Sequence, residues 1–291
     1  MHFQFVEFRV KILVTGATGF IGNHVVRELL KRKIEVIATS RRTIKAERYA
    51  WFSRVRYVQC DLNETREDFF SFFMRPTCMI HLAWEGLPNY KDLLHFEKNV
   101  MVHYNFIKNM VQHGLSHVVV AGSCLEYGMQ NGCLTEDLDT NSTIPYGLAK
   151  DTLRKYLEQL LARHPVTFQW VRLFYMYGEG QSEKSLLSQL ETAIKKGEKR
   201  FNMSGGEQLR DYLPVEKVAE YIVAIALQDK VKGIINCCSG EPLSVRKLVE
   251  KYLEEKGYCI ELNLGYYPYP DYEPMEFWGN NTKLQSVLHQ S

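Results

Sequence analysis

The segment VKILVTGATGFIGNHVVRELLKRK, which begins at Val10, constrains the fold more than any other part of the chain. Its first residues form a short β-branched run, which is typical of a buried parallel strand. Three glycines follow with the spacing G-x-x-G-x-x-G, and apolar residues then recur with helical period. This order predicts a strand, a tight turn and a helix whose N-terminus faces a dinucleotide pyrophosphate. The residues expected to bind it here are Gly16, Thr18, Gly19, Phe20, Ile21 and Gly22.

The end of the next predicted strand, residues 34–40, bears on which dinucleotide is bound. A site for NAD usually places an acid about 20 residues after the glycine loop, where it holds the ribose 2′-hydroxyl. This chain has Ser40, Arg41 and Arg42 there and no acid. Arginine pairs well with a 2′-phosphate, although two arginines at the start of a loop can also be simply solvated. We therefore predict NADP as cofactor, with NAD as the alternative.

Strand-like and helix-like segments alternate along the chain. Further apolar strands are predicted at residues 56–62, 78–84, 117–123 and 168–174, and helical stretches separate them. This alternation predicts an α/β fold, a doubly wound parallel sheet of the Rossmann type. We assign residues 10–174 and 212–239 to this domain, residues 175–211 and 240–291 to a smaller substrate lobe, and residues 1–9 to an extension.

Composition excludes several classes of protein. The 36 Lys and Arg residues balance 34 Asp and Glu residues, so a net charge of +2 gives no reason to expect nucleic-acid or anionic-membrane binding. No stretch approaches the roughly 20 apolar residues of a membrane span. The seven cysteines lack the paired spacing of a zinc site and are typical of reduced thiols. We expect no metal and a cytoplasmic location.

A tyrosine and a lysine stand one helical turn apart in PYGLAKDTLRKYLEQL, which begins at Pro145. Residues at positions i and i+4 share a helix face, so Tyr146 and Lys150 are predicted to point the same way. A nearby ammonium favours the phenolate, which predicts a lowered pKa for Tyr146 and a general acid or base at this position. A tyrosine packed at a helix start beside a solvated lysine is the simpler alternative.

Taken together, the motifs resemble the extended short-chain dehydrogenase/reductase family, in its nucleotide-sugar branch. The resemblance covers nearly all of residues 10–250. The segments that carry it are, in chain order, GATGFIG, DL at Asp61–Leu62, HLA at His81–Ala83, GSCLEYG, PYGLAK, RLFYMYGEGQ, GGEQLRDYLPVEKVAE and INCCSGEPLSV.

The resemblance implies roles for individual residues. It makes Tyr146 the proton donor or acceptor, Lys150 the residue that binds the nicotinamide ribose, and Ser123 the partner of the reacting oxygen. It places Arg210 against the substrate diphosphate, and Asn99 either near the site or in a structural position. Further cofactor contacts are implied for Asp61, Leu62, Leu82 and Ala83, and substrate contacts for Trp84, Ser123, Cys124, Glu126, Tyr175 and Arg210. Homodimers are common in the family.

Departures from the family pattern narrow the implied reaction. Cys124 and Leu125 stand where the 4,6-dehydratases of the family carry Asp-Glu, so elimination of water is not expected. The longer matches resemble the dTDP-6-deoxy-L-talose 4-dehydrogenase group, which implies reduction of dTDP-4-dehydro-L-rhamnose. Formation of dTDP-D-fucose from dTDP-4-keto-6-deoxy-D-glucose, 4-epimerisation of a nucleotide sugar, and a non-catalytic dinucleotide sensor are the alternatives.

Overall fold

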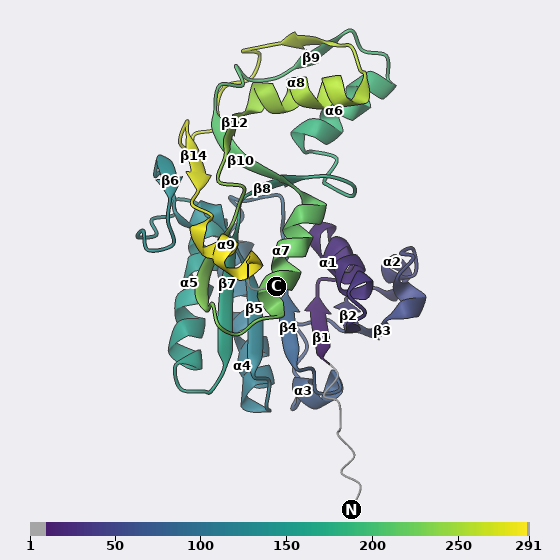
Figure 1. Cartoon of the computed structure of the whole chain (residues 1–291), viewed down its shortest axis with the longest axis vertical. Coiled ribbons are helices and arrows are strands. Elements are labelled where there is room, and N and C mark those ends of the chain that lie inside the picture. The colour runs from purple at the N-terminus through teal and green to yellow at the C-terminus, as the bar shows by residue number, and fades with distance from the viewer. Residues whose placement is uncertain (1–9, 290–291) are drawn as a thin grey trace, which may run out of the picture.

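The computed structural model describes residues 10–289 and is built on a central seven-stranded parallel sheet (Figure 1). The expectation for residues 1–9 lies outside the described residues. In the sheet the strands follow the order β11-β7-β5-β4-β1-β2-β3. They are β1 (Lys11–Thr15), β2 (Glu35–Ser40), β3 (Arg56–Gln59), β4 (Cys78–His81), β5 (His117–Ser123), β7 (Thr167–Leu173) and β11 (Gly233–Cys237). The predicted doubly wound α/β class is confirmed.

Helices cover both faces of this sheet, because successive residues of each strand point to opposite sides. Ile12 and Val14 belong to the core under one helical layer, and Leu13 belongs to the core under the other. The first layer contains α1 (Phe20–Lys31), α2 (Thr43–Ala46), α7 (Val215–Ala226) and α9 (Thr282–Leu288). The second contains α3 (Phe69–Phe72), α4 (Val100–Gln112) and α5 (Pro145–Leu161).

The direction in which successive strands are added to the sheet reverses between β1 and β4, and this reversal determines where the site lies. The chain runs outward from β1 through β2 to β3 and then returns to β4 on the other side of β1. In open α/β sheets ligands bind at such a switch point, beyond the carboxyl ends of the strands. The glycine loop after Thr15 and the residues after His81 therefore meet at one edge of the sheet.

A smaller lobe rises above this edge (Figure 1). Its own apolar core includes Leu190, Phe201 and Val249. The lobe contains α6 (Leu186–Lys195), α8 (Val245–Lys256), the strand pair β9 (Arg200–Asn202) and β13 (Glu261–Asn263), and the sheet of β8 (Tyr175–Tyr177), β10 (Leu209–Pro214) and β12 (Pro242–Ser244). A further pair, β6 (Gly132–Leu134) and β14 (Phe277–Gly279), lies beside the main sheet (Figure 1).

The end of the chain differs from the expected domain division. We assigned residues 240–291 to the smaller lobe, but α9 packs against α7 and β11 of the main domain. Leu284 and Val287 are fully buried in the core of that domain, and burial of these two side chains holds the helix there. Within residues 10–289, no helix is long and apolar enough to cross a membrane.

Candidate active site

A cavity of about 450 Å³ opens where the glycine loop meets the ends of β2, β3 and β4. Strands β3 and β4 end earlier than predicted, at Gln59 and His81, so the residues that follow them belong to loops. The predicted cofactor-binding residues that line this cavity are Gly16, Thr18, Gly19, Ser40, Arg41, Arg42, Asp61, Leu62, Leu82 and Ala83. Phe20, Ile21 and Gly22 lie in the first turn of α1 and do not line it. Tyr146 and Lys150, which were also predicted to bind the cofactor, lie on α5 and do not line it either.

The conformation and packing of the glycine loop require glycine at two positions. Gly16 has a φ of +68°, and a Cβ there would lie 2.8 Å from the backbone nitrogen of Ala83. A Cβ on Gly22 would lie 2.2 Å from the Gly16 carbonyl oxygen, so this glycine serves packing of the loop on α1. No side chain caps the N-terminus of α1 at Gly19. The first amides of α1 are therefore available to an anion.

The cavity suits a nicotinamide dinucleotide on chemical grounds as well. Thr39 lines it, and the Thr39 hydroxyl is buried and has no hydrogen-bond partner within residues 10–289. An unpaired buried hydroxyl is costly unless a ligand satisfies it. The predicted cofactor contacts left out Thr39, Lys45 and Glu85, which also line the cavity. The positions of Thr39 and Glu85, next to Ser40 and Trp84 at the ends of predicted strands, were usable signals.

Ser123 and Tyr146 meet beside this cavity. Ser123 ends β5 and Tyr146 is the second residue of α5, and the Ser123 hydroxyl lies close enough to the phenol to lower the pKa of Tyr146 slightly, against the larger opposite effect of burial. The Tyr146 ring packs edge-on against Trp84, a residue that lines the cavity, and its centroid lies 5.2 Å from that of His95. The two predicted catalytic hydroxyls are thus adjacent and only slightly exposed.

The prediction that Lys150 lowers the pKa of Tyr146 is wrong for this structure. Burial raises the pKa of Tyr146, and Tyr90 and Glu126 add to the effect. The Lys150 ammonium is directed elsewhere. It donates a hydrogen bond of 2.8 Å to the Ala121 carbonyl and lies 3.9 Å from the centroid of the Trp84 ring. Burial lowers the pKa of Lys150 to about 7, so the lysine titrates near neutrality and the phenol stays protonated.

The lowered pKa of Lys150 predicts a pH dependence of stability. The unfolded lysine binds a proton up to its ordinary pKa of 10.5, whereas the folded one releases it near 7. The unfolded state therefore binds more protons between these values, and stability must rise with pH. From pH 7 to 9.5, we expect the free energy of unfolding of the parent to gain roughly 2–3 kcal/mol relative to Lys150→Met. Urea denaturation of both proteins measures this, and parallel pH curves would contradict it.

Glu126 was predicted to contact the substrate, but in the structure it lies in the protein interior. Its side chain is fully buried and pairs with Arg172 at 2.8 Å. The same carboxylate accepts hydrogen bonds from the backbone nitrogen of Ser123 at 2.7 Å and from the Trp170 indole at 2.9 Å. These partners leave no free face for a sugar. Glu126 instead fixes the backbone of Ser123 from behind the site.

Arg210 is buried, and its guanidinium already has partners. Nη2 lies 3.1 Å from a carboxylate oxygen of Glu273, and Nη1 donates to the carbonyls of Leu209 and Met275. Tyr175 lies next to this pair, its ring centroid 6.0 Å from the guanidinium carbon. Burial and Glu273 raise the pKa of Tyr175 well above its usual value. A substrate diphosphate bound at Arg210 would therefore contact a guanidinium that already forms an ion pair with Glu273.

Cys124 and Asn99, two further residues named from the sequence, differ in their surroundings. The Cys124 thiol is buried in a small apolar cluster, and burial raises its pKa, which does not suit a nucleophile. Asn99 is buried, lines the cavity and donates a hydrogen bond of 3.0 Å to the Glu85 carbonyl. Asn99 is therefore near the site and structural at once.

The aromatic segment 265–280 lies beside the loop that follows Trp84. Asp271 pairs with Lys91 at 3.1 Å, and Tyr272 raises the pKa of Tyr90 after the larger effect of burial. The same segment supplies Glu273, the partner of Arg210. Both segments therefore border the region between Tyr146 and Arg210.

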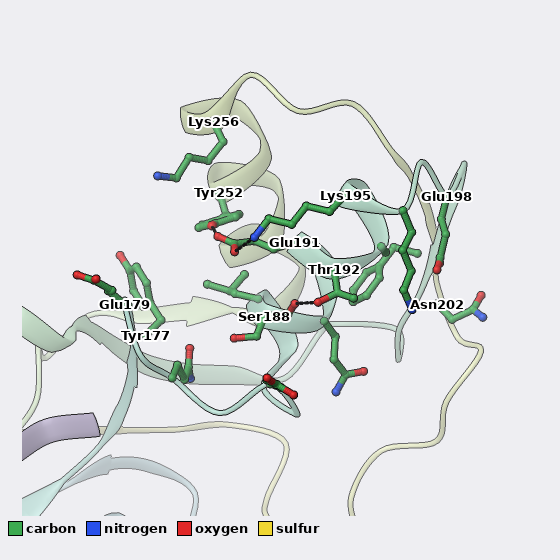
Figure 2. Close-up of a pocket in the computed structure, with 18 of the residues that line it drawn as sticks. Tyr177, Glu179, Ser188, Glu191, Thr192, Lys195, Glu198, Asn202, Tyr252 and Lys256 are labelled. Atoms are coloured by element: carbon green, nitrogen blue, oxygen red, sulfur yellow. Dashed lines mark hydrogen bonds and ion pairs between the residues drawn. The ribbon is translucent and has the colours of Figure 1, made fainter. Parts of the chain in front are cut away.

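A second hollow lies in the smaller lobe (Figure 2). It has a volume of about 990 Å³ and is lined by α6, α8 and the loop after β8. Tyr252 of α8 donates a hydrogen bond to Glu191 of α6, and Glu191 also pairs with Lys195 (Figure 2). None of the predicted substrate residues lines this hollow, and it shares no lining residue with the dinucleotide cavity.

Comparison with known proteins agrees with this architecture. Residues 12–238 match the model of the NAD dependent epimerase/dehydratase family. The chain is 30% identical over 273 residues to a dTDP-6-deoxy-L-talose 4-dehydrogenase (NAD(+)) of Aggregatibacter actinomycetemcomitans, covering 93% of this chain and 99% of that protein. It is 24% identical to a dTDP-4-dehydro-6-deoxyglucose reductase of Escherichia coli, covering 82% and 79%.

A solved structure extends the similarity to three dimensions. The structure of MoeE5 in complex with UDP-glucose and NAD has a TM-score of 0.79 and 28% identity to this chain, covering 96% of this chain and 92% of MoeE5. The family match spans both the glycine loop and the Tyr146–Lys150 pair. The chain belongs to the NAD dependent epimerase/dehydratase family.

Proposed function

We propose that the protein is a nicotinamide-dependent 4-ketoreductase of a dTDP-4-keto-6-deoxyhexose, which converts dTDP-4-dehydro-L-rhamnose to dTDP-6-deoxy-L-talose. The observation that carries the proposal is the placement of Ser123, at the end of β5, and Tyr146, at the start of α5, together beside the dinucleotide cavity. The relative of 30% identity, whose name gives 6-deoxy-L-talose as its sugar, supports this choice of substrate. NADPH is the proposed cofactor, because two arginines and no acid follow β2, and NADH is the alternative.

The side chains have distinct tasks in this reaction. The bound nicotinamide supplies hydride chemistry at C4 of the sugar. Tyr146 donates its phenolic proton to the oxygen that was the ketone, and the raised pKa keeps that proton available. Ser123 hydrogen-bonds the same oxygen and orients the phenol. Lys150 lies one turn along α5, where its ammonium donates to the Ala121 carbonyl, and we propose that it also donates to the ribose of the bound dinucleotide.

Product analysis tests the proposal. We expect NADPH oxidation with dTDP-4-keto-6-deoxyglucose only when a 3,5-epimerase is present, and NMR of the product should show the 6-deoxy-L-talose ring. Product without the 3,5-epimerase would favour the D-fucose alternative. Bound NAD with interconversion of 4-epimers and no net use of NADPH would favour an epimerase. Dinucleotide binding without turnover of any keto sugar would leave only the sensor alternative.

The role proposed for Arg210 predicts a selective loss of substrate affinity. A lysine at position 210 keeps the positive charge but loses the planar fork that suits phosphate oxygens. We expect Arg210→Lys to weaken dTDP binding by about 10- to 100-fold, equivalent to about 1.5–3 kcal/mol for a charge-assisted contact. Isothermal titration with dTDP measures the loss, and NADPH affinity should remain unchanged.

Glu273 provides the control for Arg210. Glu273→Gln keeps the shape of the partner but removes its charge, which leaves the guanidinium more available. We expect dTDP to bind this variant as tightly as the parent or more tightly. Unchanged dTDP affinity in Arg210→Lys would remove Arg210 from the substrate site.

We also propose that the protein forms a homodimer through α4 and α5. Met101, Leu148 and Tyr156 expose apolar surface on these helices, and the Tyr156 ring packs edge-on against Tyr104. Exposed apolar side chains gathered on two neighbouring helices are typical of a protein interface. Sedimentation velocity should find a dimer for the parent and a monomer for Met101→Glu/Leu148→Glu. A monomeric parent would contradict the proposal.

A further inference from the structure

Glu85 holds an unusual position at the mouth of the dinucleotide cavity. One carboxylate oxygen lies 3.0 Å from Nη1 of Arg41, and the other lies 3.0 Å from Nζ of Lys98. The hydrogen bonds from Lys98 and then Arg41 lower the pKa of Glu85, so the carboxylate is ionised at neutral pH. Its backbone is also held, because the buried Asn99 donates to the Glu85 carbonyl. Glu85 is thus a fixed negative charge beside Arg41.

The Arg41–Glu85 pair spans the switch point of the sheet. Arg41 follows β2 and Glu85 follows β4, and these two strands flank β1. The glycine loop begins at the end of β1 and forms the floor of the cavity. The Arg41–Glu85 ion pair therefore connects the two sides of the cavity. Both residues line the cavity.

The Arg41–Glu85 ion pair changes which of the arginines after β2 is available to a 2′-phosphate. An acid in this region normally accepts a hydrogen bond from the ribose 2′-hydroxyl and repels a 2′-phosphate. The end of β2 lacks that acid, but β4 places one within contact of Arg41. Arg41 is therefore held by Glu85, whose single negative charge also pairs with Lys98. Arg42 and Lys45, in contrast, form no ion pair within residues 10–289 and remain free for a phosphate.

We propose that Glu85 is a specificity-determining residue that opposes the 2′-phosphate by holding Arg41, so that the cavity accepts NADH as well as NADPH. The inference rests on the proposed use of a nicotinamide dinucleotide. It also assigns the 2′-phosphate mainly to Arg42 and Lys45.

Binding measurements on the full chain test the proposal without any sugar substrate. Titrations of NADPH and NADH, followed by nicotinamide fluorescence, are compared for the parent and Glu85→Gln. We expect Glu85→Gln to bind NADPH about 5- to 20-fold more tightly, because opening a half-exposed ion pair costs about fivefold and a like charge is also removed. NADH affinity should stay the same or fall. The gain should shrink in 0.5 M salt, which screens exposed charges.

A double-mutant cycle separates Glu85 from a general effect of charge. Arg41→Ala in the parent should change NADPH affinity less than threefold, since Glu85 already occupies Arg41. The same change in Glu85→Gln should abolish the gain, whereas Arg42→Ala should weaken NADPH in both backgrounds. Glu261→Gln, which changes the net charge equally but lies on β13 and pairs with Arg200, should leave both affinities unchanged.

Each result has a distinct meaning. A selective NADPH gain that needs Arg41 supports the inference, even if no keto sugar is turned over. Equal shifts for NADPH and NADH, or a gain that survives Arg41→Ala, would overturn the inference alone. A parent that binds neither dinucleotide would overturn the inference together with the proposed function.

Discussion

Replacement of Tyr146 by phenylalanine is expected to lower turnover by about 10²–10⁴-fold, the usual contribution of a positioned general acid. The change removes only the phenolic hydroxyl, which lies near Ser123. The ring keeps its packing against Trp84, Tyr90 and His95, so the fold should be intact. Steady-state rates with the keto-sugar substrate and saturating NADPH measure the effect.

Tyr156→Phe is a matched control for this variant. It makes the same chemical change on the same helix, but Tyr156 is half-exposed on the surface of α5 proposed for the dimer contact, where Tyr156→Phe keeps the ring and its packing against Tyr104. Its turnover should stay within twofold of the parent. Dinucleotide affinity of Tyr146→Phe should also match the parent, because the glycine loop and Lys150 are unchanged. A Tyr146→Phe enzyme within a few-fold of parental turnover would refute the acid role.

Replacement of Glu126 by alanine is expected to destabilise the protein by about 3–5 kcal/mol, the usual cost of removing one partner of a buried ion pair. Both side chains of the Glu126–Arg172 pair are essentially inaccessible to water. The change would leave the Arg172 guanidinium buried without its carboxylate. It would also remove the acceptor of the Ser123 amide and the Trp170 indole. Urea denaturation followed by tryptophan fluorescence and circular dichroism measures the loss.

Glu158→Ala is the control that separates the effect of burial from the loss of an ion pair as such. Glu158 also pairs with an arginine, Arg154, at 2.6 Å, but its side chain is 38% exposed. Ion pairs with such exposure contribute about 0–1 kcal/mol, so this variant should lose little stability. A loss in Glu126→Ala no larger than that in Glu158→Ala would show that the buried carboxylate is not needed for the fold.

The main fold was predictable because its signals are local. The strand before Gly16 and the helix after Gly19 depend on glycine spacing and on apolar periodicity within a few residues. They appear in the structure as Lys11–Thr15 and Phe20–Lys31, close to the predicted bounds. Short signals also marked most residues that line the dinucleotide cavity. Strand ends were less predictable, since β3 and β4 stop where loop hydrogen bonds replace pairing, as in the Asn63–Asp61 turn.

The electrostatics of the site were predicted less well, and Lys150 shows why. Its spacing from Tyr146 placed both on one helix face, but spacing does not reveal how deeply that face is buried. In the structure the Ala121 carbonyl and the Trp84 ring hold the ammonium, and burial raises the pKa of Tyr146. The direction of the Tyr146 pKa shift was therefore wrong.

The sequence by itself determined the parallel α/β fold and the glycine loop, because short-range patterns encode them, and it named Ser123, Tyr146 and Lys150 as the candidate catalytic residues. Only the tertiary structure decided which charges meet. Glu85 reaches Arg41 across 44 positions, Glu126 reaches Arg172 across 46, and Glu273 reaches Arg210 across 63. Such pairs depend on which strand ends come together at the sheet edge, and their strength depends on how much water is excluded there. Neither quantity is contained in the order of neighbouring residues.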